Sequence, residues 1–145
     1  MEGSAERTVR LGAPSFVYDL RTKESLGKVT TFKVSLLSAE AKLFAALPYD
    51  VGPIKASVAA GRPGEEVKVT AFAGIPKWAK ACHPVAVDVY SPDGKRSRLY
   101  SGVCDAKGGR GVHVFRTALN DARGTWRVIA TDCISGSKHY ASFEL

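Results

Sequence analysis

The strongest constraint on the fold is an alternation of apolar and polar residues over short segments that end in turns rich in Gly and Pro. The clearest segments are IKASVAA (54–60), EVKVTAF (66–72), VAVDVY (85–90) and WRVIATD (126–132). Successive side chains of a strand point to opposite faces, so each segment would bury one row and expose the other. Several such segments at regular spacing predict an all-β fold, either an antiparallel sandwich or a barrel.

Two turns between these segments have compositions that define their geometry. GRPGEE (61–66) places Pro63 and Gly64 at the central positions of a type II turn, where the second central residue needs a positive φ. SPDGK (91–95) predicts a hairpin, since Pro and Asp favour a reversal and Gly94 accepts a positive φ. We therefore expect an antiparallel partner strand directly after SPDGK.

The first fifty residues show a weaker form of the same pattern. We expect a first strand with Phe16, Tyr18 and Leu20 on one face, then a polar connection, RTKESLGK (21–28). A second strand, VTTFKVSLL (29–37), follows this connection and has one apolar row, formed by Phe32, Val34 and Leu36. The segment thus predicts a β meander or hairpin ahead of the main sandwich.

Two stretches of this N-terminal part allow other interpretations. SAEAKLFAAL (38–47) is either a strand or the start of a helix, because Ser38 can cap a helix and Ala and Leu are good helix formers. Pro48 ends the element in both cases. The opening MEGSAER (1–7) is interpreted as linker residues, and it does not have the charged and apolar regions of a secretion signal.

The alternation also predicts which side chains form the core. Trp126 begins the apolar row of its strand. We expect this row to point into the core, because a Trp on an apolar row is more often packed in a core than used as a ligand platform. The row opposite to it contains Arg127, Ile129 and Thr131. The buried rows expected to support the fold consist of Trp126, Val128, Ala130, Val85, Val87, Val89, Val67 and Val69.

Length and charge limit the classes of function. A chain of 145 residues with 45% apolar residues can bury a core without disulfides or metals. Its formal charge of +7 attracts polyanions, but the basic residues are spread singly or in pairs. We therefore expect a solvated basic surface and no specific nucleic-acid site, with a polyanion site as the alternative. No segment has the roughly 18 apolar residues of a membrane span.

The cysteine count leaves two interpretations open. Cys82, Cys104 and Cys133 are not accompanied by a second Cys or His at the spacing of a zinc site. They are either three reduced, partly buried thiols, or one disulfide plus one free thiol. Cys104 and Cys133 are the best candidates for a disulfide, provided that their strands are neighbours.

Motifs for catalysis, metals or cofactors are not found in the sequence. His83, His113 and His139 have no metal-ligand partner at i+2 or i+4, and no nucleophile elbow, phosphate loop, dinucleotide fingerprint or calcium loop occurs. Cys82 and His83 are adjacent, so in a strand they would point to opposite faces. The carboxylates at turns, such as those of Asp93 and Asp121, are expected to bond their own backbone. We expect no catalytic residues, no cofactor and no metal, and hence no enzyme.

One loop has the residue types of a binding site. IPKWAKACH (75–83) presents Trp78 between Lys77 and Lys80. An aromatic ring with flanking cations can stack on a sugar ring or a nucleobase. Alternatively, Trp78 covers one end of the sandwich core.

The order of the segments resembles a known family. RPGEEVKVTAF (62–72), PVAVDVYSPDGK (84–95) and GVHVFRTALNDARGTWRVIATDCISG (111–136), followed by SFEL, resemble the immunoglobulin-like β-sandwich modules of macroglobulin type. Upstream, FVYDLRTKESLGKV and LLSAEAKLFAALPYDV resemble the C-terminal β region of bacterial glycoside hydrolases. The resemblances imply an N-terminal β segment at 1–52 and an immunoglobulin-like sandwich at 53–145.

These resemblances also imply a function. The chain would be a non-catalytic accessory or structural module of a larger, secreted bacterial protein active on carbohydrates, extracellular or periplasmic, and its partner would be a neighbouring domain. The alternative is a carbohydrate- or polyanion-binding module that uses Trp78, Lys77 and Lys80, with a polysaccharide as partner. An exposed edge strand could also join two copies as a homodimer.

Overall fold

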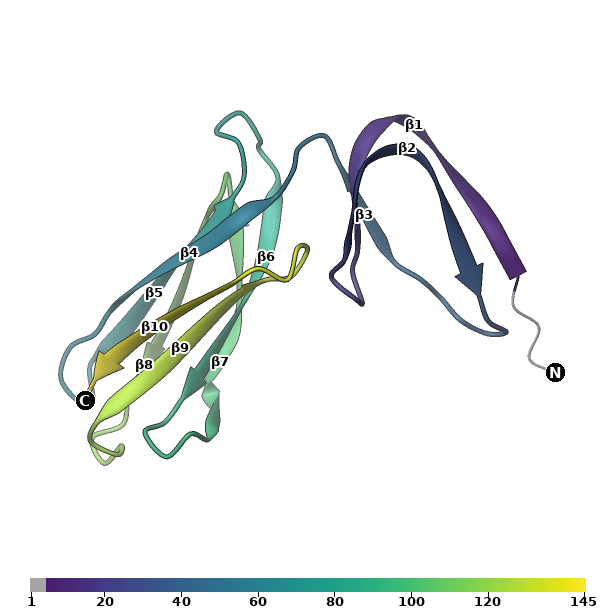
Figure 1. Cartoon of the computed structure of the whole chain (residues 1–145). Coiled ribbons are helices and arrows are strands. Elements are labelled where there is room, and N and C mark those ends of the chain that lie inside the picture. The colour runs from purple at the N-terminus through teal and green to yellow at the C-terminus, as the bar shows by residue number, and fades with distance from the viewer. Residues whose placement is uncertain (1–4) are drawn as a thin grey trace. The chain divides into compact units, whose positions relative to one another are not determined.

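The computed structural model describes residues 5–145, which form ten β-strands joined by turns (Figure 1). The described residues contain no helix, and the strands pair in an antiparallel manner. The chain divides between Asp50 and Val51 into two compact units, each with its own sheet. The predicted all-β class is confirmed.

The first unit is a three-stranded sheet in which the longest strand lies in the middle. The strand order is β2-β1-β3, and β1 pairs antiparallel with both neighbours. The strands are β1 (Ala5–Asp19), β2 (Ser25–Leu36) and β3 (Phe44–Leu47).

The predicted ends of the first two strands need correction. β1 begins at Ala5, so part of the expected linker belongs to the sheet, while residues 1–4 lie outside the described residues. The polar connection expected at 21–28 is shorter, because β2 begins at Ser25. Asp19 closes the reversal: its Oδ1 accepts hydrogen bonds from the backbone N–H groups of Arg21 (2.8 Å) and Thr22 (3.1 Å). Because the carboxylate stabilises the turn, β1 and β2 can be joined by a short connection.

The helix considered for residues 38–47 does not form. Residues 44–47 are strand β3, paired with residues 16–19 of β1. The ring of Phe44 also packs on Phe32 of β2, with ring centroids 4.9 Å apart. These long-range contacts outweigh the helix propensity of Ala and Leu, which is a weak preference.

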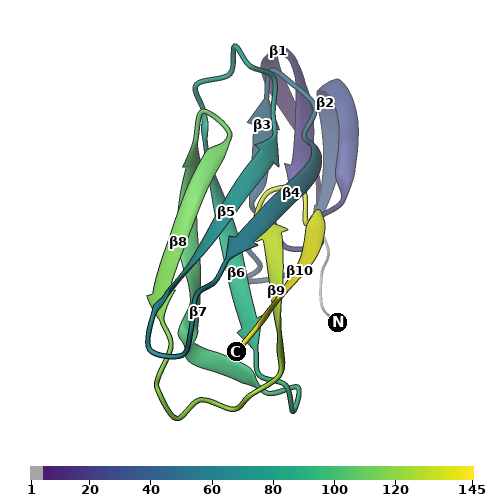
Figure 2. The ribbon, with the colours of Figure 1, turned by 90° about the vertical axis from the view of Figure 1, so that its left-hand side faces the viewer.

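The second unit is an immunoglobulin-like antiparallel β-sandwich, as the sequence predicts. Its seven strands follow the order β10-β9-β6-β7-β8-β5-β4 (Figure 2). The β7–β8 pair is joined by the single residue pair Lys107 and Arg110, and the sheet folds over there into two layers. The strands are β4 (Gly52–Ala59), β5 (Glu66–Gly74), β6 (Cys82–Tyr90), β7 (Arg96–Lys107), β8 (Arg110–Arg116), β9 (Thr125–Asp132) and β10 (Lys138–Glu144).

Both predicted turns of the sandwich are confirmed. The backbone N–H of Glu65 donates to the carbonyl of Arg62 at 3.0 Å, and Gly64 has φ +88°, as a type II turn with Pro63 and Gly64 at its centre requires. In the β6–β7 hairpin, Gly94 has φ +85° and donates its N–H to the carbonyl of Ser91 at 2.8 Å. These turns set the strand pairings on either side of them.

The predicted core rows are confirmed, and aromatic rings join the two layers. All eight residues of the predicted rows are buried, and Trp126 is only 4% exposed. Tyr100 of β7 stacks on Phe115 of β8 at 5.0 Å and contacts Trp126 of β9 at 5.6 Å. Phe143 of β10 lies 6.1 Å from both Phe115 and Trp126. This aromatic cluster fills one end of the sandwich core.

Candidate binding surfaces

The structure brings Trp78, Lys77 and Lys80 together on one exposed loop between β5 and β6. The loop is held in place by Ala79, which is buried and donates its N–H to the carbonyl of Pro76 at 2.9 Å. Trp78 itself is 64% exposed, and both lysines are exposed. Trp78 therefore does not cover the end of the core, and the binding interpretation of this loop stays a prediction.

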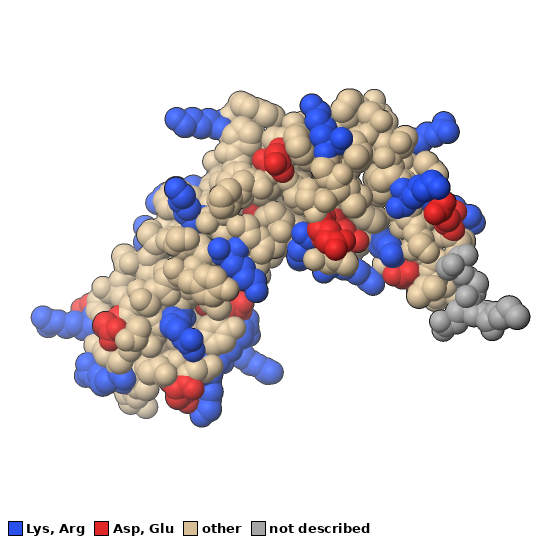
Figure 3. All heavy atoms as spheres, viewed as in Figure 1, with Lys and Arg blue, Asp and Glu red and all other residues tan. Residues whose placement is uncertain are grey.

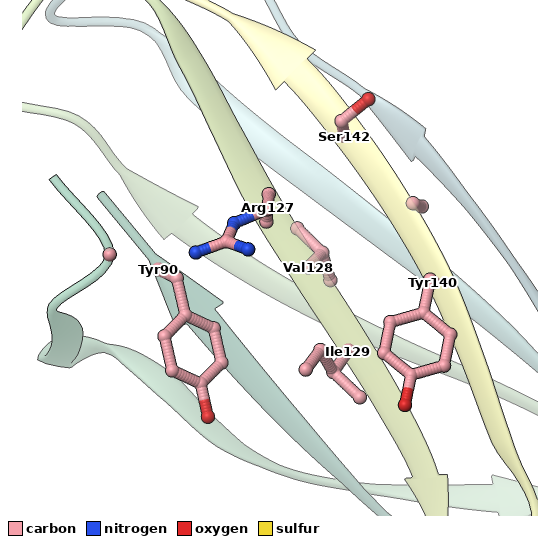
Figure 4. A pocket seen from close by; sticks show the side chains of 8 residues that line it. Tyr90, Arg127, Val128, Ile129, Tyr140 and Ser142 are labelled. Atoms are coloured by element: carbon pink, nitrogen blue, oxygen red, sulfur yellow. The ribbon is translucent and has the colours of Figure 1, made fainter. Parts of the chain in front are cut away.

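A second candidate surface is a groove on the outer face of the β6-β9-β10 layer. Strand register creates it: Tyr90 lies opposite Arg127, while Tyr140 lies opposite Ile129. Figure 4 shows the Tyr90 and Tyr140 rings on either side of Ile129. The groove has a volume of about 510 Å³, and its lining consists of Tyr90, Gly94, Arg127, Val128, Ile129, Tyr140, Ala141 and Ser142.

The groove contains one cation whose charge is not matched. The guanidinium of Arg127 lies over the ring of Tyr90, 6.0 Å from its centroid, a cation–π arrangement that orients the side chain. Among residues 5–145, no carboxylate lies within 4.0 Å of Arg127. The nearby Asp88 of β6 is bound instead to Arg96, with 2.5 Å between Oδ1 and Nε. Arg127 is thus available for an anionic group.

The sequence contained part of the signal for this groove. Alternation placed Tyr90 opposite to the row of Val85, Val87 and Val89, and it placed Arg127 and Ile129 opposite to the row of Trp126, which makes them outward-facing. Alternation did not show that β9 pairs with both β6 and β10. The pairing with β6 could not be predicted locally, since β6 and β9 are far apart in the chain. Only that register brings Tyr90, Arg127 and Tyr140 to one surface.

The sandwich also contains one buried His–Asp pair, which sequence reasoning did not identify. Nδ1 of His83 lies 3.0 Å from Oδ2 of Asp132, and both side chains are buried. Cys82, the neighbour of His83, is exposed, so the two point to opposite faces as predicted. Because the pair is sealed from solvent, a substrate has no access to it, and its role is structural.

His113 and the carboxylate of Asp121 have local roles. Nε2 of His113 lies 2.7 Å from the carbonyl oxygen of Tyr100. Asp121 accepts the N–H of Ala118 at 2.8 Å, which confirms the expected turn role of its carboxylate. Within residues 5–145, no three His, Cys, Asp or Glu side chains are grouped so that they could hold a metal ion.

The strands that contain or precede Cys104 and Cys133 are not neighbours, so the condition for a disulfide between these residues is not met. β6 lies between the strands of these residues, and Val85 of β6 pairs with Cys104 on one side and with Asp132 on the other. Two strand spacings, about 9.5 Å, separate positions on β7 and β9, whereas a disulfide needs Cα atoms within about 7 Å. None of the three cysteines forms a disulfide, and burial raises the pKa of the Cys104 thiol, with a smaller contribution from Asp105.

Charge is dispersed over the surface. Figure 3 shows Lys and Arg scattered over the visible face, with Asp and Glu between them. Several of the lysines and arginines form ion pairs, such as Lys33 with Glu6 (2.8 Å) and Lys95 with Asp93 (2.9 Å).

In its described part the chain has no helix of the length and apolar character needed to cross a membrane.

The second unit thus has the fold of an immunoglobulin-like β-sandwich. No protein-family model matches the chain, and no curated protein matches it. Among solved structures it is similar to the cryo-EM reconstruction of the native conformation of E. coli alpha-2-macroglobulin, at 17% sequence identity and a TM-score of 0.45. The match covers all of this chain and 10% of that chain, so the chain spans about a tenth of the macroglobulin's length.

Proposed function

We propose that the chain is a non-catalytic accessory module of a larger, secreted protein active on carbohydrates, and that it works by packing against a neighbouring domain. The observation that carries the proposal is the small core of the first unit. Its described residues include only four buried hydrophobic side chains, those of Val17, Tyr18, Val34 and Tyr49. The sandwich, in contrast, has a continuous core built from all seven of its strands.

A three-stranded sheet with so few buried side chains is marginal by itself. Sheets become independently stable when a hydrophobic face packs on another layer. Phe16, Phe32, Phe44 and Leu47 are only partly buried, and Leu43 is 57% exposed. Covering these side chains with a surface of a neighbouring domain would remove apolar area from water at about 25 cal/mol per Å².

The test compares the stability of the two units as separate fragments. Residues 51–145 should unfold in one cooperative transition in urea, monitored by tryptophan fluorescence, to which the buried Trp126 and the exposed Trp78 contribute. Residues 1–50 should show no cooperative transition by circular dichroism, because their core is too small. Cooperative unfolding of the 1–50 fragment, with a stability similar to that of the sandwich, would contradict the proposed need for a packing partner.

A second candidate function is binding of a carbohydrate or polyanion through the Trp78 loop. It is favoured by the 64% exposure of Trp78 between two exposed lysines. The test is binding to neutral polysaccharides, anionic polysaccharides and DNA at two salt concentrations. Binding that survives high salt and is lost in Trp78→Ala supports sugar recognition by this loop, whereas binding lost with salt in both proteins indicates net charge alone.

A further inference from the structure

We propose that the groove between Tyr90 and Tyr140 binds an acidic sugar, a uronate unit of a polysaccharide. This site is distinct from the Trp78 loop. Trp78 precedes the first residue of β6 and Tyr90 is its last, so the strand separates them by about 26 Å at 3.3 Å per residue. The inference also goes beyond the proposed packing role, which does not use this face of the sandwich.

The cation of the groove accounts for the acidic group. Arg127 has no carboxylate within 4.0 Å among the described residues, and its guanidinium is held over the Tyr90 ring. A planar guanidinium can bind both oxygens of a carboxylate through parallel hydrogen bonds. Gly94 leaves space beside it, since a Cβ at this position would lie 3.5 Å from Nη2 of Arg127. The carboxylate of a uronate would therefore bind the guanidinium of Arg127, which is already oriented and has no carboxylate partner within 4.0 Å among the described residues.

The rest of the groove suits a sugar ring, which has an apolar face and a polar edge. Ile129 forms an apolar floor between the two tyrosine rings, and Tyr140 is 68% exposed. The rings of Tyr90 and Tyr140 lie on either side of this floor, and Ser142, which pairs with Arg127, adds a third hydroxyl group to the lining. The volume of about 510 Å³ lies within the range of small-ligand sites, about 300–1,000 Å³.

The position of the groove in the sheet argues against a peptide or a nucleic acid as the occupant. β9 pairs with β6 on one side and with β10 on the other, so its backbone groups are occupied. A peptide that adds a strand would pair along the free edge of β10, and would not lie over Ile129 on the face of the sheet. A nucleic acid requires several cations along its phosphates, and Arg127 is the one Lys or Arg in the groove lining.

The test is an NMR titration of the whole chain with trigalacturonic acid, with the neutral trisaccharide maltotriose as the control ligand. We expect shifts of the Tyr90, Arg127, Ile129 and Tyr140 amides with the acidic probe only. Arg127→Met should weaken binding about tenfold or more, because it removes a hydrogen bond to a charged group. Arg127→Lys, which keeps the charge but not the planar fork, should lie in between.

A matched variant separates the groove from net charge. Arg110→Met removes the same charge from β8, in the other layer, and should bind like the unchanged protein. Equal losses in the Arg110 and Arg127 variants would overturn the site, as would equal binding of maltotriose or no binding of either probe. Loss of binding in Trp78→Ala would assign the sugar to the other loop. A triglutamate peptide that binds the groove more tightly than the sugar would overturn the uronate in favour of a peptide.

Discussion

His83 and Asp132 connect the start of β6 with the end of β9 through a 3.0 Å contact between Nδ1 and Oδ2, in a region from which solvent is excluded. The second oxygen of Asp132 accepts the N–H groups of Ile134 (2.9 Å) and Ser135 (2.8 Å). One carboxylate thus satisfies a buried imidazole and the turn that leads to β10. Its hydrogen bonds are directed within the fold, which explains an acidic residue in a core strand.

Removing this carboxylate should destabilise the sandwich strongly. Asp132→Ala removes the acceptor of two turn N–H groups and one buried contact of His83, and we expect a loss of about 3 kcal/mol or more in the free energy of unfolding. Asp132→Asn keeps an oxygen for the turn and should lose less. Urea denaturation measures both. An alanine variant as stable as the asparagine variant would show that a side-chain oxygen at this position does not hold the turn.

Substitution by alanine should strongly destabilise the sandwich at one tryptophan and have little effect at the other. Trp126 is 4% exposed and its Nε1 donates to the carbonyl of Ala122 at 3.0 Å, so Trp126→Ala should cost about 3–5 kcal/mol. Trp78 is 64% exposed, and Trp78→Ala should change stability by no more than about 0.5 kcal/mol. Thermal or urea unfolding of the two variants side by side checks this. Similar losses in both would mean that Trp78 contributes to packing in solution.

Sequence reasoning succeeded where local rules decide the structure. The rows led by Val67, Val85 and Trp126 follow from the two-residue period of strands, and the turns at Gly64 and Gly94 follow from the φ angles that glycine permits. These features depend on residues close together in the chain. The all-β class and the core rows could therefore be predicted without any knowledge of which strands pair, whereas the choice of a sandwich over a barrel rested on the family resemblance.

Sequence reasoning left open, or missed, the features that depend on long-range pairing. The choice between helix and strand at residues 38–47 depended on β1, and the Cys104–Cys133 pairing depended on the order of β9, β6 and β7. The His83–Asp132 pair and the groove are likewise products of register between distant strands. No local pattern encodes these contacts, so each candidate site could be recognised only once the strands had been paired.

Stability should fall at alkaline pH, in part through Cys104. Burial raises the pKa of this thiol above its ordinary value of 9.0, so the folded state favours the protonated form. A group of this kind contributes fully below the unfolded pKa, and its contribution is lost as pH rises towards the folded pKa. The free energy of unfolding, measured in urea between pH 7 and 10, should decline less in Cys104→Ala.

The exposed thiol provides the control for this measurement. Cys82→Ala is the matched substitution, because it removes a thiol that lies on the surface of the same sandwich. Burial likewise raises the pKa of Tyr100, with a smaller contribution from its hydrogen bond to Asp121, so a further decline is expected above pH 10 in all three proteins. If Cys104→Ala and the unchanged protein decline equally between pH 7 and 10, the thiol is not the source.

Gly74 should be intolerant of even a single added methyl group. It pairs with Gly52 where β4 begins, and a Cβ at Gly74 would lie 2.8 Å from the Cα of Gly52 and closer still to its carbonyl group. Backbone atoms cannot move aside like the end of a flexible side chain, so Gly74→Ala must push the two strands apart. We expect a loss of about 1–3 kcal/mol, the cost typical of overpacking.

Gly12 of β1 is the matched control for this substitution. A Cβ there would have no atom within 4 Å, and Ala in a strand interior is favoured over Gly by about 0.5–1 kcal/mol. Gly12→Ala should therefore leave the unfolding of the sandwich, followed by Trp126 fluorescence, unchanged. Gly74→Ala should shift that transition to lower urea concentration. An unshifted transition in Gly74→Ala would mean that β4 can move away from β5 at this point without lowering the free energy of unfolding. The close approach of Gly52 and Gly74 would then not contribute to stability.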